Sequence, residues 1–263
     1  MKLYLFTGLL LSSLLCTAQQ HYTINWAQAP KNPIAFNYTA NHFALQGKIK
    51  SVTETWGDMS TYKAFNENGL LQNTVYKMGG TEVNNYTYNL AEGLIIKEQE
   101  QAGRKTVFTQ KLNEKNQLTE SSYSNDQKYW FSYNDKGLFS EKEYPSKAIL
   151  KYEYNAAGQL SKEENFREGN LTSLITYAYA QVNGQLVITC TTEYKTSGDK
   201  YVHKEFYNTN GLLVKEITAD EERTFSYQLD ISGNWILRTT VFKNLKTKSQ
   251  ISRVTNRKIE YYQ

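Results

Sequence analysis

Residues 129–143 read YWFSYNDKGLFSEKE, and this stretch contains the unit from which the rest of the chain is built. Aromatic residues alternate with polar ones up to Tyr133, and alternation with a period of two indicates a β-strand. Asn134 then opens a short polar spacer that ends in Gly137, and Phe139 begins a second run that is rich in charge. Asn at the start of a tight turn accepts hydrogen bonds from the turn amides, and Gly at its end adopts positive φ freely. The stretch therefore predicts a β-hairpin with a bulge.

The same unit recurs eight times along the chain. Each copy begins with an aromatic residue or Leu, passes through a polar spacer to Gly, and places an apolar residue two positions later. The third copy has Asn116 where the others have Gly, and Asn is the next most tolerant residue for positive φ. The first residues of the copies are Phe65, Tyr88, Leu112, Tyr133, Tyr154, Tyr179, Tyr207 and Leu229.

The recurrence predicts the architecture, because a fixed period means that one supersecondary unit is stacked on copies of itself. A lone hairpin is not stable in water, so neighbouring copies have to share one sheet. We therefore expect an all-β fold in which antiparallel hairpins stack into a long sheet that twists or winds into a spiral. The copies that end at Gly93 and Gly184 have one extra loop residue, which a surface turn tolerates.

The chain is predicted to divide into three parts. Residues 1–18 combine a basic start, a short apolar run and small residues before Gln19, which predicts a cleaved signal peptide. Residues 19–42 precede the regular pattern and are interpreted as an N-terminal cap over the first strand edge. Residues 43–263 contain no Pro/Ser-rich linker, so we expect a single β-hairpin repeat domain.

The leader also predicts where the chain is located. A cleaved signal peptide implies export, to the periplasm or the extracellular space. Lipid anchoring at Cys16 is the alternative, and Leu15 disfavours it because a small residue is required before the lipidated cysteine. Cys190 is the one cysteine after the leader, so the mature chain forms no intrachain disulfide. We expect Cys190 to be an inert core residue.

Charge and hydropathy exclude two classes of partner. The formal net charge is +4, and lysines and glutamates are interspersed without a basic block. Nucleic-acid binding requires a clustered basic footprint, so no nucleic-acid partner is expected. Beyond the leader, no stretch is long and apolar enough to form a transmembrane helix, so no transmembrane segment is expected.

The titratable residues do not predict a catalytic, cofactor or metal site. The histidines His21, His42 and His203 are scattered, and none has a Cys or His partner at ligand spacing. The acidic pairs 163–164 and 221–222 lie on expected strands, where adjacent side chains point to opposite faces. A catalytic centre needs such groups to be held together, so we predict a protein that is not an enzyme and binds no cofactor.

Aromatic side chains are the candidate binding residues. Tyr76, Tyr123 and Tyr144 each follow the turn glycine (or Asn116) by seven positions, so they are expected to form a file near the strand ends. Trp130 alternates with Phe131 and is expected on the opposite face. Rows of exposed rings stack on sugar faces or anchor a protein, but they also cover the back of a coiled sheet.

The eight copies resemble the YD repeats of the Rhs-type repeat family over about residues 60–240. In that family the motif is Tyr-Asp, a polar spacer, Gly and an apolar or Arg residue, and the repeats form hairpins that wind into a spiral sheet. Large members encapsulate a toxin in that sheet. Here the acid is usually Asn and only Asp230 keeps Asp, and no terminal toxin domain is expected. The resemblance therefore implies a small, exported, repeat-only member.

Together these features predict a non-enzymatic binding or scaffold protein of a bacterial envelope. Its partner would be a protein or a carbohydrate, held on a surface rich in tyrosine. The alternative is a structural or interbacterial-immunity protein that pairs with the edge strand of a partner or neutralises a toxin.

Overall fold

The structure is a computed structural model that describes residues 39–123 and 127–263. Within these residues, eighteen strands form one antiparallel sheet, with short 3-10 helices η1 (Ala40–Phe43) and η2 (Leu90–Glu92). None of the helices described there has the length and apolarity needed to cross a membrane. The strands are β1 (Ile49–Trp56), β2 (Met59–Phe65), β3 (Leu71–Lys77), β4 (Thr81–Asn89), β5 (Leu94–Gln101), β6 (Arg104–Leu112), β7 (Leu118–Tyr123), β8 (Lys128–Tyr133), β9 (Phe139–Glu143), β10 (Ile149–Tyr154), β11 (Leu160–Arg167), β12 (Asn170–Val182), β13 (Gln185–Tyr194), β14 (Lys200–Tyr207), β15 (Leu213–Ile217), β16 (Glu221–Leu229), β17 (Trp235–Asn244) and β18 (Gln250–Tyr261).

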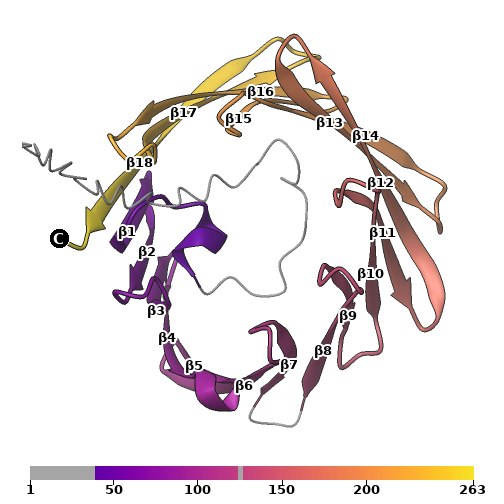
Figure 1. Cartoon of the computed structure of the whole chain (residues 1–263). Coiled ribbons are helices and arrows are strands. Elements are labelled where there is room, and N and C mark those ends of the chain that lie inside the picture. The colour runs from indigo at the N-terminus through magenta and orange to yellow at the C-terminus, as the bar shows by residue number, and fades with distance from the viewer. Residues whose placement is uncertain (1–38, 124–126) are drawn as a thin grey trace, which may run out of the picture.

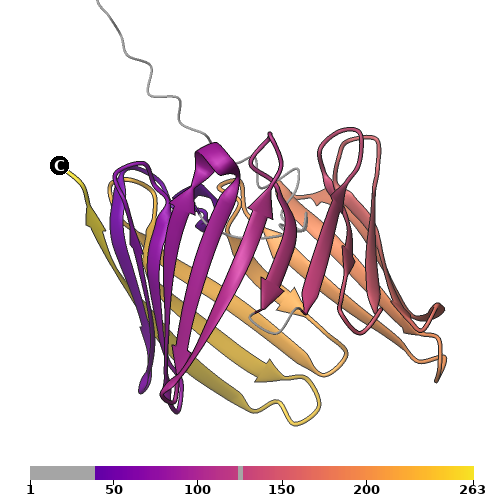
Figure 2. The same ribbon diagram turned by 90° about the horizontal axis from the view of Figure 1, so that it is seen from below.

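The sheet closes into a barrel. Each strand pairs with its neighbours in sequence, and β1 pairs with both β2 and β18 (Figures 1 and 2). The all-β antiparallel prediction is confirmed, whereas the expected long twisted or spiral sheet is instead a closed barrel. Strand twist accumulates around the ring until β18 lies beside β1, and their pairing satisfies backbone groups that an open sheet would leave free.

Closure also changes the interpretation of the N-terminal region. The predicted signal peptide (residues 1–18) and most of the predicted cap (19–42) lie outside the described residues. Thr39 forms a bridge with Leu70, and the amide of Ala40 donates to Gly69 O at 2.9 Å. These contacts are with a hairpin turn. The edge of β1, which the cap was expected to protect, is covered by β18 instead.

The motif turns have the predicted conformation in most copies. In the first, Asn66 Oδ1 accepts hydrogen bonds from the amides of Asn68 and Leu70, and Gly69 has φ of 75°. The strand register shifts next to Phe65, which marks the bulge. The same capping oxygen is present at Asn113, Asn134, Asn155, Asn208 and Asp230.

Two copies differ from this pattern. In the copy that starts at Tyr179, β12 continues to Val182, and Asn183 and Gly184 both have positive φ. Two such residues form the tight turn that matches strand twist, so the bulged turn with one extra residue was a wrong prediction there. In the copy that starts at Tyr88, the extra residue is accommodated in η2, which ends at Gly93 with φ of 64°.

The inner face of the barrel is identified by η1, which lies inside the ring of strands (Figure 1). Phe43 of η1 packs against Phe65 with ring centroids 5.9 Å apart, and Lys63 lies over the Phe43 ring. The face that carries Lys63 and Phe65 is therefore the inner face. Because side chains alternate along a strand and cross-strand partners share a face, the register extends this assignment around the barrel.

Tyrosine hydroxyls join neighbouring motifs on the inner face. Tyr133 Oη donates to Leu118 O at 2.9 Å, and Leu118 is the apolar residue after the preceding turn. The donors Tyr88, Tyr154, Tyr179 and Tyr227 bond in the same way to Leu71, Phe139, Leu160 and Leu213. Across the seam between the two ends of the sheet, Tyr262 donates to Phe65 O at 2.6 Å.

The outer face carries several ion pairs. Glu120 lies between Lys111 and Lys128, at 3.3 and 3.5 Å. Further pairs join Lys162 to Glu164 and Lys215 to Glu222. The inner face carries the buried apolar residues instead, including Phe65, Leu71, Ile95, Leu160 and Ile188.

A glycine pair tests the importance of the motif turns. A Cβ at Gly93 would lie 2.8 Å from Leu112 O, whereas Gly103, with φ of 75°, has nothing within 4 Å of that position. Gly103→Ala is expected to lower the free energy of unfolding by about 1–2 kcal/mol, since only left-handed strain is added. Gly93→Ala should lower it by about 1–3 kcal/mol more through overpacking. Urea denaturation measures both, and equal losses would contradict the assigned contact.

Candidate functional site on the inner wall

The structure brings three of the four predicted binding residues to one face. The register places Tyr76, Tyr123 and Tyr144 on the inner wall, where each ring is half-buried. Trp130 pairs with Glu120 and Glu143 on the outer wall, and 43% of it is exposed. Trp130 is therefore separated from the tyrosines by the sheet itself, as its alternation with Phe131 predicted.

Four rings form a continuous row across β6 to β9, which we call the aromatic file. Its members are Phe108, Tyr123, Tyr129 and Tyr144, with successive ring centroids 4.7, 5.5 and 5.5 Å apart and edge-to-face geometry. Sequence reasoning identified Tyr123 and Tyr144 but missed Phe108 and Tyr129. Phe108 is the direct cross-strand partner of Tyr123, a relation that only the register of β6 and β7 reveals.

Hydrogen bonding and two cations fix the aromatic file. The hydroxyls of Tyr123 and Tyr129 are 2.6 Å apart. This hydrogen bond and burial raise the pKa of Tyr123 to about 12. Lys142 lies 4.4 Å from the centroid of Tyr144, and Lys97 lies 4.7 Å from that of Phe108. The file therefore offers ring faces beside positive charge.

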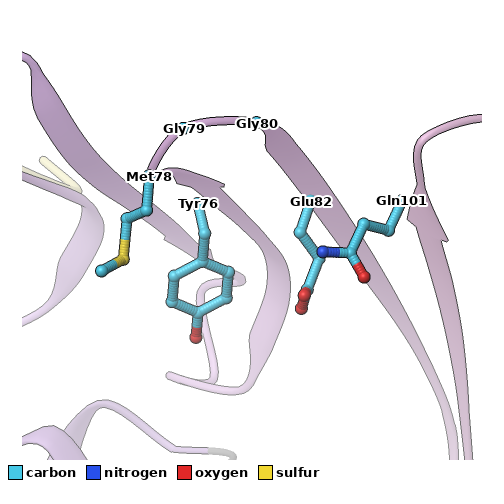
Figure 3. Close-up of a pocket in the computed structure, with 6 residues that line it drawn as sticks. All are labelled: Tyr76, Met78, Gly79, Gly80, Glu82 and Gln101. Carbon is cyan, nitrogen blue, oxygen red and sulfur yellow. The ribbon is translucent and has the colours of Figure 1, made fainter.

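Tyr76 lies apart from the file, in a hollow on β3 to β5. The hollow has a volume of about 440 Å³ and is lined by Tyr76, Met78, Gly79, Gly80, Glu82 and Gln101 (Figure 3). Tyr76 is the cross-strand partner of Glu82, and Glu82 is that of Gln101, so the three side chains share the inner face. A phenol, a carboxylate and an amide lie together here.

Buried polar residues lie beside the hollow and the file. Asn84, Gln110 and Ser121 are buried on the inner face. Asn84 Nδ2 donates to Thr74 Oγ1 at 3.0 Å and to Glu82 Oε1 at 2.9 Å. Among the described protein atoms, the side-chain oxygens of Asn84 and Gln110 have no hydrogen-bond partner. Amides beside rings are the combination that orients a polar ligand against an aromatic platform.

A charged cluster spans the seam at which β18 meets β1. Arg257 donates from Nη2 to Glu54 Oε1 at 2.8 Å, and its guanidinium carbon lies 3.5 Å from the Trp235 ring centroid. Arg238 lies 5.2 Å from the same centroid. Burial lowers the pKa of Arg257, and the charge of Glu54 opposes that shift. The ring and the carboxylate together replace the water that this buried cation has lost.

Comparisons with known proteins support the fold alone. No family model matches the chain, and no curated protein matches it. Among solved structures, the chain is similar to a porin-like protein from Bacteroides uniformis, with a TM-score of 0.51, 15% identity, and coverage of 87% of this chain and 100% of that one. Chains of the TcdB2–TccC3–Cdc42 complex and of TcdB2–TccC3 without its hypervariable C-terminal region align at a TM-score of 0.31 and 9% identity; 74% of this chain is covered but only 12% of those chains. The chain thus has the closed β-barrel fold of the porin-like structure.

Proposed function

We propose that this chain is an exported, non-enzymatic binding protein that holds a glycan against the inner wall of its barrel. The observation that carries the proposal is the aromatic file, with its four edge-to-face rings on one wall. Half-buried rings with fixed positions lose little conformational entropy when a flat apolar sugar face stacks on them. Lys142, beside Tyr144, supplies a donor for hydroxyl and acidic groups of the same ligand.

The outer wall supports a water-facing barrel instead of a lipid-facing one. Barrels that span membranes present an apolar band flanked by aromatic girdles. Here the outer face carries ion pairs such as Lys111–Glu120 and Lys215–Glu222 among its apolar residues. The function of the porin-like neighbour is therefore not transferred to this chain. The repeated Asn-x-x-Gly turns support membership of the YD-repeat type, in a closed form.

The alternative structural role is weaker after closure. Pairing with a partner's edge strand requires a free sheet edge. The edges of β1 and β18 pair with each other, so the described sheet offers no such edge. A binding role on the inner wall does not depend on one.

Single-ring variants test the glycan proposal. The mature chain is titrated by calorimetry with chitohexaose, laminarihexaose and an acidic oligogalacturonate, and we expect saturable binding to at least one of them. Tyr144→Ala or Tyr129→Ala should weaken that binding about tenfold, as expected for an aromatic anchor of about 1–2 kcal/mol. Trp130→Ala and Tyr62→Ala, which remove exposed rings from the outer wall, are the matched controls.

Two results would contradict the proposal. One is that no oligosaccharide or envelope glycan extract binds the folded wild-type chain. The other is that the outer-wall variants lose binding as much as the inner-wall variants. Lys142→Gln separates ligand classes, because it should weaken binding of the acidic sugar more than that of the neutral ones.

A further inference from the structure

Three ligand-type side chains meet on the inner wall of β14 and β15, across the barrel from the aromatic file (Figure 1). His203 and Glu205 are two residues apart on β14, and Glu216 is the cross-strand partner of Glu205 on β15. One ligand atom from each lies within 4.8 Å of the other two. We propose that His203, Glu205 and Glu216 bind a divalent transition-metal ion, with Zn²⁺ as the preferred one.

The geometry needs only small side-chain movements to hold the ion. His203 Nε2 is 3.7 Å from Glu205 Oε1. A tetrahedral zinc ion with bonds of about 2.0–2.1 Å separates its ligands by about 3.3 Å. An imidazole with two carboxylates gives three protein ligands, and the fourth position then faces the lumen. Three protein ligands with one open position are usual for zinc sites that are accessible to solvent.

Tyr207 provides independent support for this assignment. Elsewhere the motif tyrosine donates to the backbone carbonyl of the preceding copy, as Tyr179 does to Leu160 O at 2.7 Å. Tyr207 instead donates to Glu205 Oε2 at 2.8 Å, where the carbonyl of Leu186 would be the equivalent acceptor. A hydrogen bond to one oxygen of a carboxylate orients the other oxygen, which is how second-shell groups position metal ligands. The motif tyrosine of this copy thus bonds to the carboxylate of Glu205, which the site requires, in place of a backbone carbonyl.

Burial and charge favour a cation at this position. Glu205 is buried, with 3% of its surface exposed. Two carboxylates this close repel each other when both are charged, and a divalent ion removes that repulsion.

One cation competes for the site, and one ligand lines a hollow. Arg223 Nη1 is 3.4 Å from Glu216, but the same guanidinium makes a shorter contact of 2.8 Å to Glu221. Glu216 can therefore be released without leaving Arg223 unpaired. His203 also lines a hollow of about 640 Å³ between β14 and β15.

Calorimetry with zinc chloride on the mature chain tests the site. The wild-type protein is expected to bind one Zn²⁺ that His203→Ala and Glu216→Gln each weaken by more than about 100-fold, because each loses a ligand. Tyr207→Phe should weaken binding by about 10–100-fold, as second-shell changes do. His21 and His42 remain in every variant, so any zinc that they hold is unchanged.

Glu222→Gln is the matched control. Glu222 lies on the outer wall of the next strand, where Lys215 is 2.8 Å away, and its change should leave zinc binding intact. Circular dichroism confirms that each variant is folded, and Co²⁺ substitution gives a visible absorption band whose intensity reports tetrahedral coordination. The proposal is overturned if the wild-type chain binds no zinc at millimolar concentration. It is equally overturned if His203→Ala and Glu216→Gln, both folded, bind zinc like the wild-type chain.

Discussion

A chain that ends at Ser249, and so lacks β18, is expected to lose the cooperatively folded barrel. β18 supplies the partners for both β17 and β1, over the register Leu237–Lys243 on one side and Ile49–Thr55 on the other. Without it, two long strands expose unpaired backbone groups, and such edges pair with other chains. We expect aggregation or a broad melting transition, measured by light scattering after size exclusion and by circular dichroism.

A shorter truncation is the control for that experiment. Removing only Gln263, which is exposed and lies beyond the last strand, should leave a monomer with the wild-type melting temperature. If the chain that ends at Ser249 remained a monomer and melted in one sharp transition at the wild-type temperature, closure by β18 would not be what stabilises the sheet.

Arg257→Ala is expected to lower the free energy of unfolding by about 3–5 kcal/mol, the range for removing one partner of a buried ion pair. The side chain is 10% exposed and lies between Glu54 and the face of Trp235. Its removal leaves the Glu54 carboxylate without its cation and creates a cavity beside the ring. Denaturant unfolding monitored by tryptophan fluorescence measures the loss.

Two further variants separate charge from packing at this position. Arg257→Met keeps most of the volume, so it should recover part of the loss, and Glu54→Gln combined with Arg257→Met should recover more by removing the orphaned charge. Lys258→Ala is the matched control, because Lys258 is adjacent in sequence, 75% exposed and paired with Glu260 on the outer wall. A melting temperature for Arg257→Ala as high as that of Lys258→Ala would contradict the role assigned to the buried pair.

The turns and strands could be predicted from the sequence because local chemistry determines them. The closure of the barrel could not, because it depends on all the strands together. The turn at Asn134 and Gly137 could be predicted because its capping bonds join residues at most four positions apart. Closure could not, because the pairing of Val52 with Ile259 depends on the sum of small rotations between successive strands. No single motif determines that sum.

The candidate sites divide in the same way. Tyr123 and Tyr144 were found because their distance from the turn is constant, but Phe108 and Tyr129 joined them only through strand register. The proximity of His203 and Glu205 could have been predicted from the sequence, because residues two apart on a strand share a face. The spacing of His203 and Glu205 was missed because only Cys and His were considered as partners. Glu216 could be added only from the pairing of β14 with β15.

The chain of tyrosine hydroxyls has a consequence for the size of the barrel. Donors such as Tyr133 join one motif to the preceding one, and Tyr262, beyond the last motif, bonds back to Phe65 of the first. Because one motif contributes two strands, adding or deleting a whole motif keeps the strand number even, and only an even number lets the ends meet antiparallel. Barrel diameter grows with strand number, so the copy number of the motif determines the width of the interior. A gene that gained or lost one repeat would resize the lumen in a single step.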